Sequence, residues 1–343
     1  MNISIQLKSI LAKVFNLSGI INYKIRKCSK RKYLILMYHR IIPCEEAGPG
    51  VQAGMYVEPD TFEMHIRYLK NRFYIIPLSD IFDNLQDLKT MNSNLPICII
   101  TFDDGWYDFF KYAYPILEKH NVPATVFLPT EFIGTQDMFW TDEVASIISM
   151  EHKLSERLSN KGTLSNHKIE MFMNLKGSIE SQIEEVISKL KNYHYVDVRN
   201  ILEEIKITLG VNKLPRERLF LKWEEVRLMA ASGLINFGSH SANHRILVHI
   251  DGKEIVEELL SSKKKLLLEG VVKRSFIPFC YPNGSYDEKV IQIVRESGYH
   301  VAVTTENGWN NVNTPMFNLH RVAIHQDVSF IEEMFGCRIS NIF

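Results

Sequence analysis

The chain has 343 residues, of which 45% are hydrophobic and 23% are charged, an ordinary globular composition with enough apolar residues for a sizeable core. Lys and Arg total 40, as do Asp and Glu, so this balance does not point to nucleic acid or another polyanionic partner. The five cysteines are widely spaced and include no CxxC pair, which argues against a disulfide framework or a cysteine-based zinc site.

The first 32 residues form a segment of their own. Apolar residues recur at close to helical spacing up to Leu17, and a basic cluster follows (Lys24, Arg26, Lys27, Lys30, Arg31, Lys32). Such a segment either lies on an anionic membrane surface or packs on the domain as an ordinary helix. Because no signal-peptide cleavage pattern follows, we expect a cytoplasmic protein, either free or peripheral to the membrane through residues 1–32.

From residue 33 onward, strand and helix patterns alternate. The predicted strands are 33–38, 97–101, 123–128, 234–240, 275–282, 300–305 and 319–324. The predicted helices are 108–120, 223–233, 254–270 and 286–298. This alternation, with short links, predicts a mainly parallel sheet with helices outside, closed into a (β/α) barrel that occupies residues 33–343.

Residues 145–220 interrupt the alternation. The segment is charged, lacks strong strand patterns and contains helix-like stretches such as IESQIEEVISKLKN. We interpret it as a mostly helical insertion between barrel elements. A substrate lid and a structural decoration are both open, because insertions at loops are tolerated.

Polar side chains gather where predicted strands end. Asp103 and Asp104 follow the buried run ICIIT, His240 ends the strand at 234–240, and His244 comes four positions later. The two imidazoles would share one face if the turn after that strand were helical. Two histidines and a carboxylate make a three-ligand site with open positions, typical of a catalytic Zn²⁺ or a similar divalent metal.

Each of these signals alone has an ordinary explanation. A lone histidine is more often a hydrogen-bonded core residue, Asp-Gly is a common turn pair, and HxxxH occurs by chance. Their combination at strand ends is more informative, because active sites of barrels lie at that end.

Several motifs together resemble the polysaccharide deacetylases, the NodB-homology or carbohydrate esterase 4 family. TFDDG (101–105) and HSANH (240–244) match its first two motifs, and MYHRI (37–41), VPATVFL (122–128) and YPNGSYD (281–287) follow the family's order. The early MYHRI is similar to the poly-N-acetylglucosamine deacetylase branch. The resemblance implies a distorted (β/α)7 barrel, the NodB-homology fold.

Residue by residue, the resemblance implies that Asp104, His240 and His244 hold the metal, most simply Zn²⁺, with Co²⁺, Ni²⁺ or Fe²⁺ as alternatives. Asp103 would be the general base that takes a proton from the attacking water. The YPNG loop would supply a backbone N–H to the oxyanion, here from Asn283, because Pro282 has none.

Two features depart from the family pattern. Where the third motif often has an arginine, this chain has Cys280, and we expect Arg321 to reach Asp103 instead. The general acid must be a group that titrates near neutral pH, and His39 at the end of the first strand is favoured over His320. Arg321 as a rim salt bridge, and either histidine as a support of the metal site, remain the alternatives.

The resulting hypothesis is a metal-dependent hydrolase that removes N-acetyl groups from N-acetylhexosamine units of a glycan. An O-acetyl esterase of the xylan type is the alternative within the hydrolases. A phosphohydrolase would more naturally show D-x-D and Mg²⁺. A catalytically inactive glycan-binding barrel is the alternative from another class, and the intact set of site residues argues against it. Trp106, Trp140 and Trp309 are candidate sugar platforms or core residues.

Overall fold

A computed structural model describes residues 3–29, 32–48, 51, 54–84, 95–150, 172, 175–209 and 218–343. The chain forms two compact units. Unit 1 comprises residues 1–43, 53–135 and 220–343, and unit 2 comprises residues 44–52 and 136–219. Lys30 and Arg31 of the basic cluster, and residues 151–171, 173–174 and 210–217 of the predicted insertion, lie outside the described residues.

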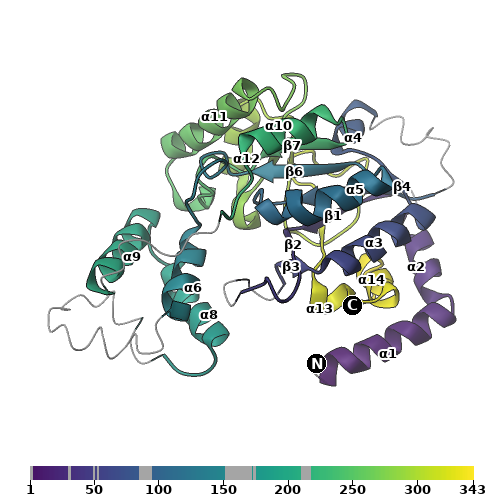
Figure 1. Cartoon of the computed structure of the whole chain (residues 1–343). Helices are drawn as coiled ribbons and strands as arrows, with labels where there is room; N and C mark the ends of the chain where they lie inside the picture. Colours follow the sequence, from purple (N-terminus) through teal and green to yellow (C-terminus); the bar gives the residue numbers. More distant parts are fainter. Residues whose placement is uncertain are drawn as a thin grey trace. The chain divides into compact units, whose positions relative to one another are not determined.

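Unit 1 is built on a curled, mainly parallel sheet (Figure 1). Its strands run in the order β10-β1-β5-β6-β7-β8-β9, while β11 pairs with β1 and β4 with β5. The strand bounds are β1 Lys32–Tyr38, β4 Tyr74–Ile75, β5 Ile97–Phe102, β6 Ala124–Leu128, β7 Ile235–Ser239, β8 Pro278–Cys280, β9 Val301–Val303, β10 Asn310–Asn311 and β11 Val322–Ala323. A separate small pair joins β2 (Arg40–Ile41) to β3 (Tyr56–Val57). The seven predicted strands correspond to β1, β5, β6, β7, β8, β9 and β11.

The chain between β10 and β11 closes the barrel. Leu319 forms a parallel bridge with Val303 of β9, and three residues later Val322 pairs in parallel with Leu36 of β1. The closing contact with β9 is therefore a single bridge, which makes the barrel distorted. The predicted (β/α)7 fold class is confirmed.

The central strands are buried on both faces, as their unbroken apolar runs require. Every residue of β5 and of β6 is buried. A core cluster within the sheet joins β1, β5, β6, β8 and β9 through side chains such as Ile35, Ile99, Phe127, Cys280 and Val301. Parallel strands packed in this way bring their carboxyl ends to one rim.

The helices of unit 1 precede, connect and follow its strands. They are α1 Ile3–Leu17, α2 Ile20–Cys28, α3 Pro59–Arg72, α4 Leu78–Asn84, the π-helix η2 Phe109–Ala113, α5 Tyr114–His120, α10 Trp223–Ala231, η4 Leu247–His249, α11 Gly252–Leu268, η5 Pro282–Gly284, α12 Glu288–Glu296, α13 Gln326–Ser329 and α14 Glu332–Ile339. In the described part of the chain, no helix has both the length and the apolar character needed to cross a bilayer. The predicted helices at 223–233, 254–270 and 286–298 correspond to α10, α11 and α12.

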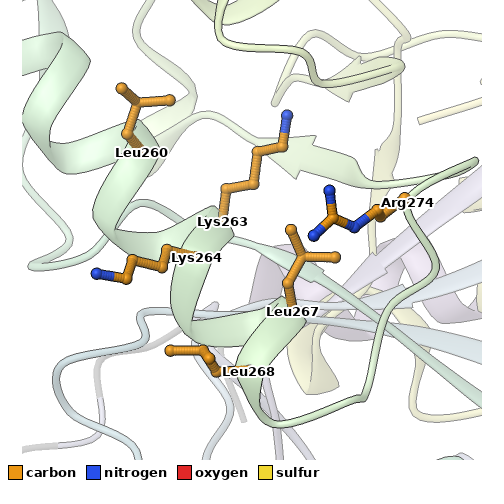
Figure 2. Close-up of a pocket in the computed structure, with 6 residues that line it drawn as sticks. All are labelled: Leu260, Lys263, Lys264, Leu267, Leu268 and Arg274. Atoms are coloured by element: carbon orange, nitrogen blue, oxygen red, sulfur yellow. The ribbon is translucent and has the colours of Figure 1, made fainter.

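A shallow hollow of about 430 Å³ lies along α11 (Figure 2). Three leucines and three basic residues line it: Leu260, Leu267, Leu268, Lys263, Lys264 and Arg274. None of the predicted site residues is among them.

Unit 2 is helical where the structure describes it. Helices α6 (Trp140–Met150), α8 (Ile179–Leu190) and α9 (Tyr195–Leu209) pack around a core of their own. α8 coincides with the helix-like stretch recognised in the sequence, and Ser178 caps it. Within that unit, the buried Glu143 accepts hydrogen bonds from Arg199 and Lys206.

Candidate metal centre

The strand ends of unit 1 bring the predicted ligands together. Asp104 follows β5, while His240 and His244 belong to the loop after β7. Oδ1 of Asp104 lies 3.4 Å from Nε2 of His240 and 3.3 Å from Nε2 of His244. Asp104 and His240 are almost fully buried, whereas the side chain of His244 is 25% exposed. The three donor atoms thus face one point, which remains open on the side of His244.

The spacing of these atoms fits a shared cation better than direct ion pairs. Charge-assisted N–H···O⁻ contacts are usually 2.7–2.9 Å. Donor atoms bound at about 2.0–2.1 Å to one tetrahedral ion lie about 3.3 Å apart. One carboxylate oxygen with two imidazole nitrogens is also a common ligand set of a catalytic zinc site with an open position.

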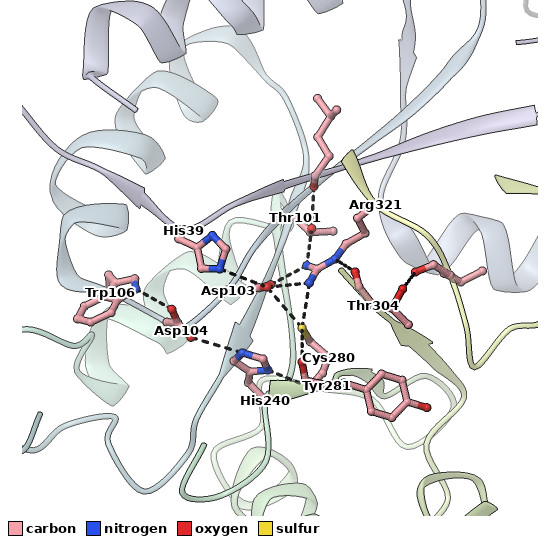
Figure 3. A network of polar contacts seen from close by, with 12 residues as sticks. His39, Thr101, Asp103, Asp104, Trp106, His240, Cys280, Tyr281, Thr304 and Arg321 are labelled. Atoms are coloured by element: carbon pink, nitrogen blue, oxygen red, sulfur yellow. Dashed lines mark hydrogen bonds and ion pairs between the residues drawn. The ribbon is translucent and has the colours of Figure 1, made fainter. Parts of the chain in front are cut away.

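The orientation of His240 supports the same interpretation (Figure 3). Its Nδ1 lies 2.8 Å from the carbonyl oxygen of Cys280. A carbonyl can only accept, so Nδ1 carries the proton and donates it. In the neutral ring, the lone pair is then on Nε2, the atom that faces Asp104.

The second oxygen of Asp104 has a separate partner. The indole Nε1 of Trp106 donates a hydrogen bond to Oδ2 at 3.0 Å, which leaves Oδ1 toward the imidazoles. The Trp106 ring is buried, stacks on Phe220 and lies under the guanidinium of Arg40. Trp106 therefore positions the carboxylate and is not a sugar platform.

The pKa values around this cluster have distinct physical causes. Burial alone would raise the pKa of Asp104, but the two imidazoles that face it hold that pKa well below its usual value. Burial lowers the pKa of His244. Burial also works against the proton on His240, yet the groups around it, including Cys280 and Asp104, raise its pKa. A cation at Nε2 would take the place of that proton.

Asp103 turns its carboxylate toward Arg321 and still lies next to one of the three ligands. One of its oxygens, a ring nitrogen of His240 and Sγ of Cys280 lie within 4.8 Å of one another. The Asp103 carboxylate forms a two-pronged ion pair with Arg321, with Oδ1 2.7 Å from Nη1 and Oδ2 2.8 Å from Nη2. The predicted contact between Arg321 and Asp103 is therefore present. Burial would raise the pKa of Asp103, but the Arg321 guanidinium outweighs that effect and holds it below its ordinary value.

Arg321 is fixed on all sides and is not a rim residue. Its side chain is fully buried, and it donates from Nε to the carbonyl of Thr304 at 2.7 Å and from Nη1 to Oγ1 of Thr101 at 3.2 Å. Nη2 also lies 3.2 Å from Sγ of Cys280. The small Cys280 side chain leaves room for a guanidinium that arrives from another strand.

Of the two candidate acids, one lies at the site. Nε2 of His39 is 3.9 Å from Oδ2 of Asp103, and its side chain is 17% exposed (Figure 3). His320 instead lies 3.4 Å from Glu306.

Asn283 is an exposed residue of the turn after β8, in a left-handed conformation (φ 58°). Its side chain donates to Ser285, and no recorded contact among the described residues joins it to Asp104.

The sequence predicted that His240 and His244 share one face only if the turn after the strand is helical. That turn is not helical, and the two imidazoles meet for a different reason. Ser241 (φ 60°) and His244 (φ 55°) both adopt the left-handed conformation, and this tight loop turns the second imidazole back toward the first. Asp104 (φ 72°) is left-handed as well. Backbone strain of this kind often occurs at functional sites.

Sequence reasoning missed the residue that holds this loop. Glu258 of α11 is buried, and its Oε2 accepts hydrogen bonds from the backbone N–H groups of Ala242 (3.0 Å) and Asn243 (2.8 Å). Its Oε1 accepts a third from the Asn243 side chain. The sequence did contain a signal for this role. Glu258 is a carboxylate on the buried face of an amphipathic helix, between Ile255 and Ser262, where a charge needs a partner.

Comparisons with known proteins identify the family of this chain. The family model described as polysaccharide deacetylase matches residues 91–302, more than half of the chain. YxkH of Bacillus subtilis (strain 168), whose name assigns it to the polysaccharide deacetylases, is 23% identical over 313 residues, which cover 91% of this chain and 77% of YxkH.

Solved structures show the same fold at low sequence identity. A deacetylase from Streptococcus pyogenes, PplD, solved with acetate, superposes with a TM-score of 0.55 at 20% identity, covering 87% of this chain and 94% of that one. IcaB from Ammonifex degensii gives a TM-score of 0.55 at 16% identity, covering 91% and 98%. The match of the family model, taken with the distorted parallel barrel, shows that this chain belongs to the polysaccharide deacetylase family.

Proposed function

We propose that this protein is a metal-dependent hydrolase that removes the acetyl group from N-acetylhexosamine units of a glycan and releases acetate and a free amine. The observation that carries the proposal is the convergence of Asp104, His240 and His244, with the ionised Asp103 beside them. A divalent cation bound there, Zn²⁺ as the first choice, would polarise the acetyl carbonyl and lower the pKa of a water.

Asp103 is the proton acceptor for the attacking water. A base must be ionised and correctly oriented, and Arg321 provides both conditions by binding each carboxylate oxygen. Oδ2 also accepts from the Cys280 thiol, whereas Oδ1 keeps a further lone pair for the water proton. The same ion pair restrains Asp103 while the proton moves.

His39 is the donor that protonates the leaving amine. It follows β1 at the rim and lies next to Asp103, so one histidine and one aspartate border the reacting group. His320 is the weaker candidate because its recorded partner is Glu306. The backbone N–H of Asn283 is our candidate for the oxyanion donor, from the turn that follows β8.

The proposed specificity for N-acetyl groups is based on the similarity of the MYHRI motif, at the end of the first strand, to one branch of the family. The MYHRI motif places His39 as in the poly-N-acetylglucosamine deacetylase branch. An O-acetyl ester would be attacked by the same groups, because ester and amide differ at the leaving atom only. An amine needs protonation to leave, whereas an alcohol needs it less, so a dedicated acid such as His39 favours the amide.

The test combines metal analysis with acetate release. Purified wild-type protein is analysed for bound metal and incubated with N-acetylglucosamine oligomers and, separately, with acetylated xylan. We expect about one equivalent of divalent metal and acetate from the amide substrate. Asp104→Ala should lose the metal and at least about 10³-fold in turnover, since the three-ligand set is broken.

Asp60→Ala is the matched control, because Asp60 is an exposed aspartate on α3. It should behave as wild type in both measurements. Full activity of metal-free wild-type protein would refute the metal-dependent mechanism. Acetate release from xylan alone would replace the amide assignment by an esterase.

A further inference from the structure

The N-terminal helix has two apolar faces, and only one of them packs. Ala12 is fully buried, and α1 contacts the C-terminal helix α14. The next helix, α2, packs there too, through the buried Ile21 and Ile25. Gly336 of α14 lets Ile21 approach closely, since a Cβ there would lie 2.9 Å from its side chain. The two helices are thus attached to the barrel by one side.

The opposite side of α1 carries an exposed row of large aliphatic residues, which we call the N-terminal apolar stripe: Leu7, Ile10, Leu11, Val14 and Leu17. Their exposed fractions run from 49% to 88%. The spacing i, i+3, i+4, i+7 places them on one face of the helix. A soluble protein rarely leaves a continuous row of this kind in water without a partner.

The positive charge of the N-terminal segment indicates an anionic partner. The first 32 residues contain eight Lys and Arg (Lys8, Lys13, Lys24, Arg26, Lys27, Lys30, Arg31, Lys32), and no Asp or Glu occurs before Glu45. With 40 basic and 40 acidic residues in the whole chain, the remainder has a net charge of −8. At about 100° per residue, Lys8 and Lys13 fall on opposite borders of the stripe.

This arrangement fits a helix that lies in the plane of an anionic membrane surface. Aliphatic side chains enter the acyl region, and the bordering lysines extend to the headgroups. α1 has 15 residues and is about 22 Å long, shorter than the roughly 30 Å of bilayer hydrocarbon, so it cannot span. A second copy would bring like charges together along the whole stripe, which disfavours self-association.

We propose that residues 3–28 bind this deacetylase peripherally to anionic lipid membranes, through the N-terminal apolar stripe and its bordering lysines. The inference stands apart from the catalytic proposal, because none of these residues belongs to the metal centre. Its consequence is that a glycan presented at a lipid surface would be the accessible substrate.

Vesicle sedimentation with the full-length chain tests this. We expect binding to vesicles of phosphatidylcholine mixed with phosphatidylglycerol, little binding to phosphatidylcholine alone, and weaker binding as salt rises. Leu7→Ser/Leu11→Ser/Val14→Ser should reduce binding at least about tenfold, because three side chains that would enter the acyl region no longer gain apolar transfer energy there. Lys8→Glu/Lys13→Glu should reduce binding to the anionic vesicles in the same assay.

The hollow on α11 supplies matched controls, since it also presents exposed leucines and lysines (Figure 2). Leu260→Ser/Leu268→Ser and Lys264→Glu should bind vesicles as wild type does. Acetate release from a soluble oligomer should be unchanged in every variant. The proposal fails if wild type stays in the supernatant, if the stripe variants bind normally, or if the stripe variants instead dissociate a dimer that ignores vesicles.

Discussion

Two adjacent aspartates have different surroundings at this site because their backbone conformations differ. Asp104 has φ 72°, a left-handed conformation that Asp tolerates better than most residues, and its carboxylate faces two imidazoles. Asp103 is bonded through its own N–H to the carbonyl of Tyr38 and turns its carboxylate to Arg321. Asp104 thus lies with the two imidazoles that could bind a metal, and Asp103 lies beside the buried guanidinium of Arg321.

Arg321 is the residue whose replacement separates these roles. We expect Arg321→Met to lower kcat for acetate release by about 10²–10³-fold, because Asp103 loses its orientation and the charge that keeps it ionised. KM should change less, since Arg321 is buried behind Asp103 and away from solvent. Steady-state kinetics on an N-acetylglucosamine oligomer measures both constants.

Removing one partner of a buried ion pair can cost about 3–5 kcal/mol of stability, so folding needs its own control. Thermal unfolding and metal content of Arg321→Met show whether the barrel and the metal centre persist. Arg321→Lys keeps the charge without the two-pronged geometry and should recover part of kcat. A folded Arg321→Met protein with wild-type kcat would remove Arg321 from the mechanism.

Glu258 acts through the loop it holds. Glu258→Gln keeps the shape, but it removes the charge and turns an N–H₂ group toward the donors of Ala242 or Asn243. We expect about 10–100-fold weaker metal binding in competition with a chelator, with kcat largely restored at saturating metal. Glu257→Gln, an exposed neighbour on α11, should match wild type. Equal affinities for both variants would leave Glu258 without a positioning role.

At the scale of elements, seven strands could be predicted because long buried runs such as ICIIT leave few alternatives. The two-residue strands β2, β3, β4 and β10 have no such run and were not predicted. The rim position of Asp103, Asp104 and His240 followed from where those runs stop. Local loop conformation could not be predicted: the left-handed residues at Ser241 and His244 have no signature in HSANH. β11 also proved shorter than its apolar run, at two residues.

The contact between Arg321 and Asp103 was a different kind of prediction. It joins residues 218 positions apart, and it was inferred from a missing arginine at Cys280 and a charge inside an apolar run. A buried charge needs an oppositely charged or hydrogen-bonding partner. This requirement predicts a contact between residues far apart in the sequence, which hydrophobic periodicity cannot do. Glu258 obeys the same rule on α11 and could have been found by it.

The packing of α3 between the barrel and α14 includes a buried histidine. His65 is fully buried, stacks on Phe335, and donates from Nε2 to the carbonyl of Ser329 at 2.7 Å. Nδ1 therefore accepts from the hydroxyl of Tyr38, 3.2 Å away. Burial lowers the pKa of His65 from 6.5 to about 3, so the ring is neutral in the fold.

That shift makes stability depend on pH. Between pH 6.5 and about 3, the unfolded chain takes up a proton at residue 65 that the folded chain does not. The free energy of unfolding should therefore fall as pH drops through this window, by up to about 1.4 kcal/mol per pH unit from this group. Denaturant unfolding measured across the window tests the slope.

His65→Phe removes the titrating group and keeps the stacking on Phe335, so its slope should be shallower than that of wild type. Its absolute stability should also be lower, because the Ser329 carbonyl loses a donor. His194→Phe, at an exposed position, should keep the wild-type slope. If wild type and His65→Phe lose stability in parallel on acidification, His65 does not contribute to the acid sensitivity.

At the scale of the whole molecule, the barrel brings residues from distant parts of the chain to one rim. His39, Asp104 and His240 follow the ends of three different strands of unit 1, and only the folded unit places them together. A ligand that needs all of these positions binds the folded chain and not the unfolded one. Binding free energy at the site therefore adds to the free energy of unfolding.

Metal removal should consequently lower the melting temperature. At a free zinc concentration about 100 times Kd, binding stabilises the fold by about 2.7 kcal/mol, which corresponds to roughly 5–10 °C for a unit of this size. Differential scanning fluorimetry with a chelator and with added Zn²⁺, Co²⁺ or Ni²⁺ measures this shift. Asp104→Ala should lose it, whereas Asp60→Ala should keep it. A wild-type protein that melts at one temperature in both conditions would show that the three donor atoms do not hold an ion.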